Sequence, residues 1–142
     1  MIKRKISWII PFYNEEKVIL ELLKRINNVS QKLNKFDWEL ILIDDGSSDN
    51  TKNILKNIKN FPFDLFLLSF SRNFGHQSAV QAGIDNCKGS AAIIIDADLQ
   101  DPPEVMEELL KQWNEGYEVV HAVRSDRKGE LKSKKALAHI FY

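Results

Sequence analysis

The chain has 142 residues, 44% of them hydrophobic, which is enough for one core of ordinary domain size. Twenty basic residues balance twenty acidic ones, so no overall field favours nucleic acid as a partner. One cysteine, Cys87, excludes a disulfide framework within the chain and fits a reducing compartment. The apolar run before Pro11 is too short for a signal peptide or a membrane span, and we expect no segment of these residues to cross a membrane.

Apolar runs and amphipathic stretches alternate along the chain. We expect strands at 6–12, 38–43, 64–70, 91–96 and 117–124, and helices at about 14–33, 50–60, 76–86 and 103–114. Asn14 is a plausible cap for the first helix. Strands separated by helices of this length predict an α/β fold, a mostly parallel sheet with helices on both faces. Without repeats or low-complexity linkers, the sequence predicts a single domain over residues 1–142.

Two carboxylates, Asp96 and Asp98, follow the β-branched run of the fourth expected strand. In an extended segment alternate side chains point the same way, so this pair could converge on one ion, and Gln100 could add an amide oxygen. Hard oxygen ligands suit Mg²⁺ or Mn²⁺ carrying a phosphate. The alternative is a polar strand end, because acidic residues after strands are common turn formers.

Polar clusters follow three of the expected strands, at residues 11–15, 44–47 and 96–98. The carboxyl ends of parallel strands share one edge, where ligands of such sheets bind. The helix-to-strand turns carry no carboxylate pair, so this shared placement favours a binding site. A carboxylate at Asp44 or Asp45 could accept the ring N–H of uracil or guanine, and Gly46 permits a positive-φ turn. A turn with a helix cap is the alternative for residues 44–49.

Neither Gly-x-x-x-x-Gly-Lys nor Gly-x-Gly-x-x-Gly occurs in the sequence, so a metal between the aspartates and a diphosphate would replace the glycine-rich phosphate loop. A nucleotidyltransferase is disfavoured because the loop after the first strand is Tyr-Asn-Glu-Glu, without the glycines and basic residues such enzymes place there.

Five stretches match one family in order and spacing. They are Ile-Pro-Phe-Tyr-Asn-Glu-Glu (10–16), Asp-Asp-Gly-Ser-Ser-Asp (44–49), Ser-Arg-Asn-Phe-Gly-His-Gln (71–77), Asp-Ala-Asp-Leu-Gln-Asp-Pro-Pro-Glu (96–104) and Arg-Ser-Asp-Arg-Lys-Gly-Glu (124–130). On these residues the chain resembles the family 2 glycosyltransferases of the GT-A fold, a Rossmann-like α/β fold. Within that family it is similar to the polyprenyl-phosphate hexose synthases.

The resemblance implies a site for each part of the reaction. The nucleotide sugar would be bound by Pro11, Tyr13, Glu15, Asp44, Asp45, Gly46, Arg72, Gly75, Asp96, Ala97 and Asp98. The divalent metal, Mg²⁺ or Mn²⁺, would be held by Asp96 and Asp98 with Gln100 nearby. Arg124 and Arg127 would act on phosphates, completing a catalytic set with Asp96 and Asp98, and a solvated basic loop is their alternative. His76 is interpreted as a helix-start residue rather than a catalytic base.

The resemblance further implies inverting transfer of a hexose, from UDP-glucose or GDP-mannose, to a polyprenyl phosphate at the cytoplasmic face of a membrane. A different acceptor, or sugar-nucleotide binding without transfer, stays open. Since such enzymes continue well past this length, we expect the chain to be a catalytic part. Basic and apolar residues alternate over 128–141, which predicts a basic amphipathic helix on an anionic membrane surface, or else a terminal helix packed on the core.

Overall fold

The computed structural model describes residues 3–123. The chain divides into two compact units, which meet in sequence between Glu108 and Leu109. A single domain over residues 1–142 therefore stays a prediction. All strands of the described residues, and the candidate site below, belong to the first unit.

Strands and helices alternate through the described residues, which confirms the α/β class. The elements are β1 (Lys5–Phe12), α1 (Ile19–Lys32), β2 (Asp37–Asp44), α2 (Thr51–Lys56), β3 (Asp64–Ser69), α3 (His76–Asn86), β4 (Ala91–Ile94), the 3-10 helix η1 (Pro103–Val105) and α4 (Met106–Asn114).

Two of the predictions on elements are wrong. Residues 117–123 form no strand, although their apolar alternation favours one, and Arg124 lies outside the described residues. A strand needs a neighbour to supply ladder hydrogen bonds, and the described sheet pairs no strand with this segment. Helix α1 begins at Ile19 with Val18 at its cap position, so Asn14 does not cap it. Asn14 instead has a φ of 56° and lies in the loop before the helix.

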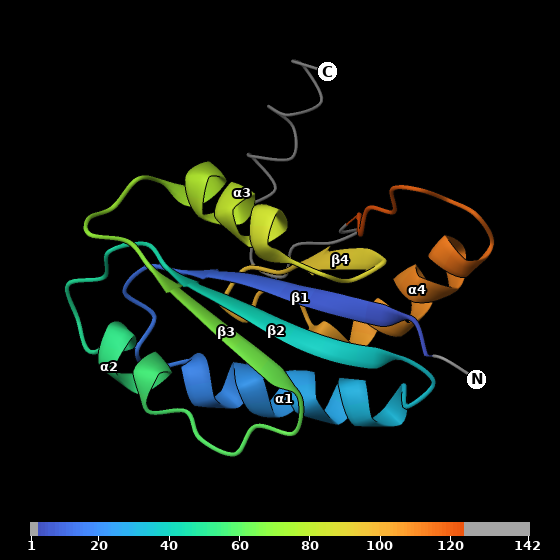
Figure 1. The fold of residues 1–142 in the computed structure, drawn as a ribbon, viewed down its shortest axis with the longest axis horizontal. Coiled ribbons are helices and arrows are strands. Elements are labelled where there is room, and N and C mark those ends of the chain that lie inside the picture. Colours follow the sequence, from blue (N-terminus) through green and yellow to red (C-terminus); the bar gives the residue numbers. More distant parts are fainter. Residues whose placement is uncertain (1–2, 124–142) are drawn as a thin grey trace, which may run out of the picture. The chain divides into compact units, whose positions relative to one another are not determined.

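The four strands form one parallel sheet in the order β3-β2-β1-β4. Helices α1 and α2 lie on one face of this sheet and α3 lies on the other (Figure 1). From β1 the chain crosses to β2 and β3 on one side and then returns to β4 on the opposite side of β1. The gap between the carboxyl ends of β1 and β4 is therefore the topological switch point, where ligands of open parallel sheets bind.

Each face of the sheet has its own core. On the α1 face, the Trp8 indole N–H donates to Ser30 Oγ at 3.1 Å, and the Trp8 ring stacks on Trp38. On the α3 face, Ile9 and Ile43 are fully buried, and a Cβ atom at Gly83 of α3 would lie 2.3 Å from Ile9 Cγ2. Only glycine lets the helix approach β1 this closely.

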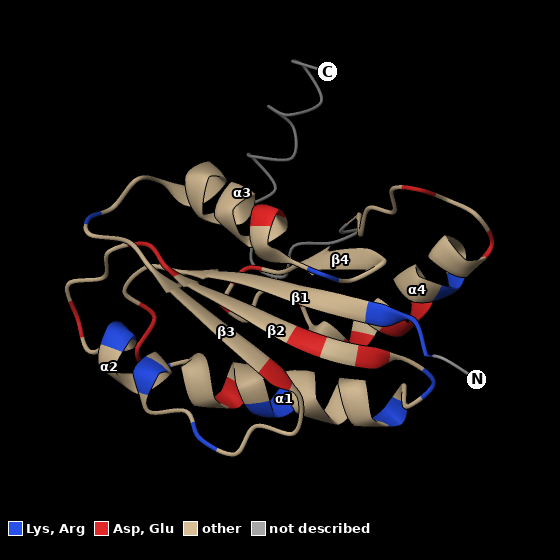
Figure 2. Ribbon diagram, viewed as in Figure 1, with Lys and Arg blue, Asp and Glu red and all other residues tan. Residues whose placement is uncertain are grey.

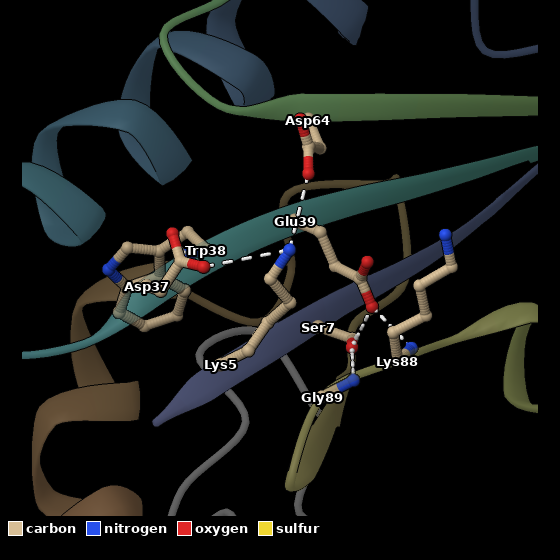
Figure 3. Close-up of polar contacts among 8 residues, drawn as sticks. All are labelled: Lys5, Ser7, Asp37, Trp38, Glu39, Asp64, Lys88 and Gly89. Atoms are coloured by element: carbon tan, nitrogen blue, oxygen red, sulfur yellow. Dashed lines mark hydrogen bonds and ion pairs between the residues drawn. The ribbon is translucent and has the colours of Figure 1, made fainter. Parts of the chain in front are cut away.

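Polar residues join the strands at the amino-terminal edge of the sheet (Figure 3). The Glu39 carboxylate, 2% exposed, accepts hydrogen bonds from the Ser7 hydroxyl and the Lys88 backbone N–H. Ser7 Oγ in turn accepts from the Gly89 N–H at 2.9 Å. This buried network ties the turn before β4 to β1 and β2, and the β1–β4 register that follows begins at Ile6 and Ala91.

Candidate active site

A cavity of about 300 Å³ lies at the carboxyl edge of the sheet, at the switch point between β1 and β4. The loops after β1, β2, β3 and β4 and the first residue of α3 all contribute to it. Its lining residues are Pro11, Phe12, Tyr13, Glu15, Asp45, Asn73, Gly75, His76, Asp96, Ala97 and Asp98.

Most of the site residues predicted from the sequence meet in this cavity. Those that line it are Pro11, Tyr13, Glu15, Asp45, Gly75, Asp96, Ala97 and Asp98. Those that do not are Asp44, Gly46, Arg72 and Gln100. Arg124 and Arg127, with the whole segment 128–141, lie outside the described residues.

Asp96 and Asp98 reach the cavity by a different backbone path from the one expected. Strand β4 ends at Ile94, and residues 97–98 form a turn rather than an extended segment. Leu99 has a φ of 61°, and Asp98 Oδ1 accepts the Gln100 N–H at 2.9 Å. The expectation that Gln100 continues the strand alternation is therefore wrong, because the positive φ at Leu99 breaks it. Both carboxylates nevertheless line one cavity.

The electrostatics of the pocket are dominated by acidic groups. Burial raises the pKa of the Glu15 carboxyl, and the nearby charges of Asp98 and Asp49 raise it further. His76 Nε2 lies 3.5 Å from Asp96 Oδ1, with both side chains more than half exposed. Four of the lining side chains are carboxylates and one is a histidine, so a cation would offset the repulsion among them.

The donor set fits a hard divalent cation. Within residues 3–123 no group of three or more His, Cys, Asp or Glu side chains is arranged to hold a metal. Two carboxylates beside an open cavity leave room for oxygens of a bound phosphate and for water, which is how Mg²⁺ is commonly held. Asp96 and Asp98 are thus residues that could hold Mg²⁺ or Mn²⁺ together with a substrate.

Asp44, the last residue of β2, and Asp45, which follows it, have different surroundings. Asp44 is fully buried, and its carboxylate accepts from the Ser47 N–H at 3.1 Å and the Ser69 hydroxyl at 2.9 Å. Asp45 lines the cavity, and its two oxygens accept from the Phe74 N–H at 2.7 Å and the Gly75 N–H at 3.0 Å. Asp44 therefore stabilises the turn, whereas Asp45 holds the 73–75 loop against the pocket.

Gly46 and Arg72 do not line the pocket and approach each other closely. Gly46 has a φ of 67°, as expected for its turn, and a Cβ atom there would lie 2.2 Å from the Arg72 backbone carbonyl carbon. The close approach that requires glycine is therefore between two loops of the chain. The Arg72 guanidinium stacks over the Phe74 ring at 4.3 Å from its centroid. These contacts shape the loop that carries Gly75, which itself has a φ of 96°.

Three lining residues, Phe12, Asn73 and His76, were not among the predicted site residues. Asn73 and His76 belong to the stretch after β3, which ends at the same sheet edge as the other strands. The rule that ligands bind at the carboxyl ends of parallel strands would have included that stretch. The expectation that His76 starts a helix is confirmed, because α3 begins there with Gly75 at its cap position.

The fold and the pocket define the GT-A class of glycosyltransferase structures. The mannosyltransferase PcManGT from Pyrobaculum calidifontis, solved with GDP-Man and Mn²⁺, is similar with a TM-score of 0.66 and 23% identity, over 80% of this chain and 33% of that one. TarS from S. aureus, residues 1–349 with UDP, is similar with a TM-score of 0.63 and 24% identity, over 86% of this chain and 40% of that one. At this identity the likeness shows the fold.

The sequence relatives give the family. A model described as Glycosyl transferase family 2 matches residues 7–140, and the chain belongs to this family. It is 47% identical to the uncharacterised glycosyltransferase YkcC of Bacillus subtilis (strain 168), over 96% of this chain and 42% of that protein. It is 40% identical to a bactoprenol glucosyl transferase of Shigella phage SfV, over 97% of this chain and 45% of that protein. The chain thus spans less than half the length of these relatives.

Proposed function

We propose that this domain binds a nucleotide diphosphate sugar together with Mg²⁺ or Mn²⁺ and moves the hexose to a polyprenyl phosphate. One observation carries the proposal. Residues from four loops, far apart in the sequence, meet in one acidic cavity at the switch point, and eight of the eleven lining residues are those that the family pattern assigns to the donor. Family membership, which makes the chain part of a transferase, supports the same reading.

The donor is proposed to be UDP-glucose, with GDP-mannose as the alternative. A relative named bactoprenol glucosyl transferase, 40% identical, supports a glucosyl donor and a polyprenyl carrier. Tyr13, which is 47% exposed, offers a flat face to a base, and Asp45 lines the same pocket. A pocket of about 300 Å³ suits part of such a ligand, because small-molecule pockets usually measure about 300–1,000 Å³.

The side chains of the pocket supply positioning rather than a strong base. A polyprenyl phosphate is largely ionised near pH 7 and is already nucleophilic. A divalent cation bound by Asp96 and Asp98 would offset charge on the donor's diphosphate. In the proposed transfer a phosphate oxygen of the acceptor forms a bond to the anomeric carbon. The bond from that carbon to the diphosphate oxygen breaks, and the nucleoside diphosphate leaves with its electron pair. A single displacement inverts the anomeric configuration.

A second candidate function is sugar-nucleotide binding without transfer by these residues. It is favoured by the content of the cavity, since each predicted residue that lines it was assigned to the donor or the metal. The residues predicted to act on phosphates, Arg124 and Arg127, lie outside the described part of the chain.

Titration calorimetry tests donor binding directly. UDP-glucose, GDP-mannose and UDP-GlcNAc are each titrated into the protein with and without Mn²⁺. We expect binding of one donor that depends on Mn²⁺, and no Mn²⁺-dependent binding by the Asp96→Asn variant. Equal binding of all three with no metal effect, or no binding at all, overturns the proposal.

A radiolabelled transfer assay with undecaprenyl phosphate then separates the two candidates. Donor binding with transfer supports the hexose synthase, and donor binding without transfer supports the binding domain. Peripheral attachment to the cytoplasmic face through residues 128–141 is a separate proposal. It predicts sedimentation with anionic vesicles that falls steeply with salt, because the Debye length is about 8 Å at physiological ionic strength. Within residues 3–123, no helix has the length and apolarity needed to span a membrane.

A further inference from the structure

Asn14 stands between two residues of the pocket wall without lining the pocket itself. Tyr13 and Glu15 both line the cavity, whereas Asn14 is exposed and is not among the lining residues. Its φ of 56° lies in the left-handed region, which costs non-glycine residues free energy and which asparagine tolerates better than most. The backbone therefore adopts a left-handed conformation at this position, between the two lining residues.

The Asn14 side chain joins the loop after β1 to the loop after β2. Asn14 Oδ1 accepts from the Ser48 N–H at 2.8 Å, the Ser48 hydroxyl at 3.2 Å and the Asp49 N–H at 3.3 Å. The Asn14 N–H donates in the opposite direction to Ser47 Oγ at 3.0 Å. One residue thus makes four hydrogen bonds to residues more than thirty positions away.

Neighbouring residues continue this junction in both directions. The Glu15 N–H donates to Thr51 Oγ1 at 2.8 Å, and the Glu16 N–H donates to Asp49 Oδ2 at 3.3 Å. Glu16 Oε2 accepts from the Asn50 N–H at 2.8 Å. The stretch 14–16 is therefore held by hydrogen bonds to both the side chains and the backbone N–H groups of residues 47–51.

We propose that Asn14 is a positioning residue that holds Tyr13 and Glu15 in the pocket wall by locking these two loops together. The inference rests on the proposed function and deepens it, because it names a residue outside the cavity that sets the affinity for the donor. Asp96 and Asp98 come from the loop after β4, and Asn14 makes none of the contacts described for that loop. Loss of Asn14 is therefore expected to affect nucleotide binding more than metal binding.

Three substitutions separate the side-chain acceptor from the backbone conformation. Asn14→Asp keeps an acceptor oxygen and tolerates the left-handed region. Asn14→Gly keeps the conformation and removes the acceptor. Asn14→Ala removes the acceptor and disfavours the conformation. Asn28→Ala is the matched control, since Asn28 is an exposed asparagine on α1, far in sequence from both loops.

The measurements are the dissociation constants for the preferred nucleotide sugar and, in its absence, for Mn²⁺ by electron paramagnetic resonance. Asn14→Ala is expected to weaken nucleotide binding by roughly tenfold or more, the equivalent of 1.4 kcal/mol. Asn14→Gly should fall between that variant and the parent, and Asn14→Asp and Asn28→Ala should bind within about threefold of the parent. The affinity for Mn²⁺ should change by less than about threefold in all of them.

The outcomes separate this inference from the proposed function. If the parent protein binds no nucleotide sugar, the proposed function fails. If the parent binds and both Asn14→Ala and Asn14→Gly bind as tightly, the positioning role alone is overturned. Parallel losses of nucleotide and Mn²⁺ affinity, together with a lower melting temperature, would show a general structural role and also overturn it. Should Asn14→Ala fail to fold, Asn14→Gly and Asn14→Asp still give the comparison.

Discussion

The two edges of the sheet both carry acidic residues, and they use them in opposite ways. At the amino-terminal edge each acid has a partner of opposite charge or a hydrogen-bond donor. Lys5 Nζ lies 3.2 Å from Asp64 and 3.6 Å from Asp37, and Glu39 accepts from Ser7 and from the backbone (Figure 3). Figure 2 shows the same pattern, with acidic residues at the starts of β2 and β3 beside a basic residue at the start of β1.

At the carboxyl edge four acids share one cavity. Asp98 helps to raise the pKa of Glu15, and Asp96 shares the same cavity. Like charges gathered in one cavity destabilise a fold, so four carboxylates in this cavity favour a ligand site over a structural one. Acids at the amino-terminal edge should therefore matter for stability, and the acids that line the cavity should matter for binding.

The largest expected effect tests the binding half of this comparison. Asp96→Asn or Asp98→Asn should abolish Mn²⁺-dependent donor binding, because an amide replaces a charged ligand for a hard cation. Circular dichroism should remain like that of the parent, since both side chains line an open cavity rather than a packed core. Calorimetry is the measurement, and unchanged nucleotide affinity in both variants would contradict the assignment.

The second prediction tests the stability half. Glu39→Ala should lower the free energy of unfolding by about 1–3 kcal/mol, because it leaves the buried Ser7 hydroxyl and the Lys88 N–H without their acceptor. Donor affinity should stay within about threefold of the parent, since the residue lies at the far edge of the sheet. Urea denaturation gives the free energy, and Glu107→Ala, an exposed glutamate on α4, is the control. A fully stable variant would show that Glu39 is dispensable.

The third prediction separates two adjacent acids at the carboxyl edge. Asp45→Asn should weaken donor binding by about 1–2 kcal/mol, because its amide cannot accept from both the Phe74 and Gly75 N–H groups that fix the pocket loop. Asp44→Asn should cost about 1 kcal/mol of stability with little change in affinity, since Asp44 is buried outside the cavity. If neither variant changed donor affinity or stability, the two aspartates would be ordinary turn residues without a role in binding.

Most of the fold was predictable because the periodicity of strands and helices is local. That residues 117–123 form no strand was not predictable, since a strand forms only with a partner, and sequence alternation does not say whether one is present. Asn14 shows the same limit for a loop. Its residue type and position suggested a helix cap, whereas its hydrogen bonds go to Ser48 and Asp49, which only the tertiary fold brings near.

The candidate site was largely predictable because one topological rule places the ends of parallel strands at one edge. The details depended on backbone angles that the sequence does not specify. The positive φ at Leu99 ends the expected alternation before Gln100, and the backbone conformation at the end of β2 places Asp45 rather than Asp44 in the pocket lining. The rule that ligands bind at the carboxyl ends of parallel strands therefore identifies the region of the site, and the local backbone conformation determines which residues line it.

The fourth prediction, of a smaller effect, concerns Glu15, which lines the cavity but should also affect stability. Glu15→Gln should raise the free energy of unfolding at pH 7 by less than about 1 kcal/mol, because it removes a partly buried charge beside Asp98. The pKa of Glu15 is raised in the folded state. The stability that its protonated form contributes is therefore present below the unfolded pKa and is lost as pH rises through the folded pKa. The gain from Gln should therefore vanish near pH 3 and be complete at neutral pH. Thermal unfolding from pH 3 to 7 tests the sign, and a destabilised variant would contradict it.

The smallest effect is expected at an exposed ion pair outside the cavity. Arg25 of α1 meets Glu104 of η1 through two hydrogen bonds, with Nε to Oε1 at 3.0 Å and Nη2 to Oε2 at 2.6 Å. The hydrogen bond from Arg25 lowers the pKa of Glu104 below its ordinary value. A depressed carboxyl pKa contributes stability above its unfolded value, and this contribution is lost as pH falls through the folded value.

Glu104→Gln should therefore lower the free energy of unfolding at pH 7 by less than about 1 kcal/mol, because the Glu104 side chain is 49% exposed and its charge is screened by solvent. The difference from the parent should shrink below about pH 4 and also in 1 M salt, where the Debye length is about 3 Å. Donor affinity should not change, since neither partner lines the cavity. A double-mutant cycle with Arg25→Ala isolates the pair, and a coupling energy that is independent of pH would show that the pair contributes through packing rather than charge.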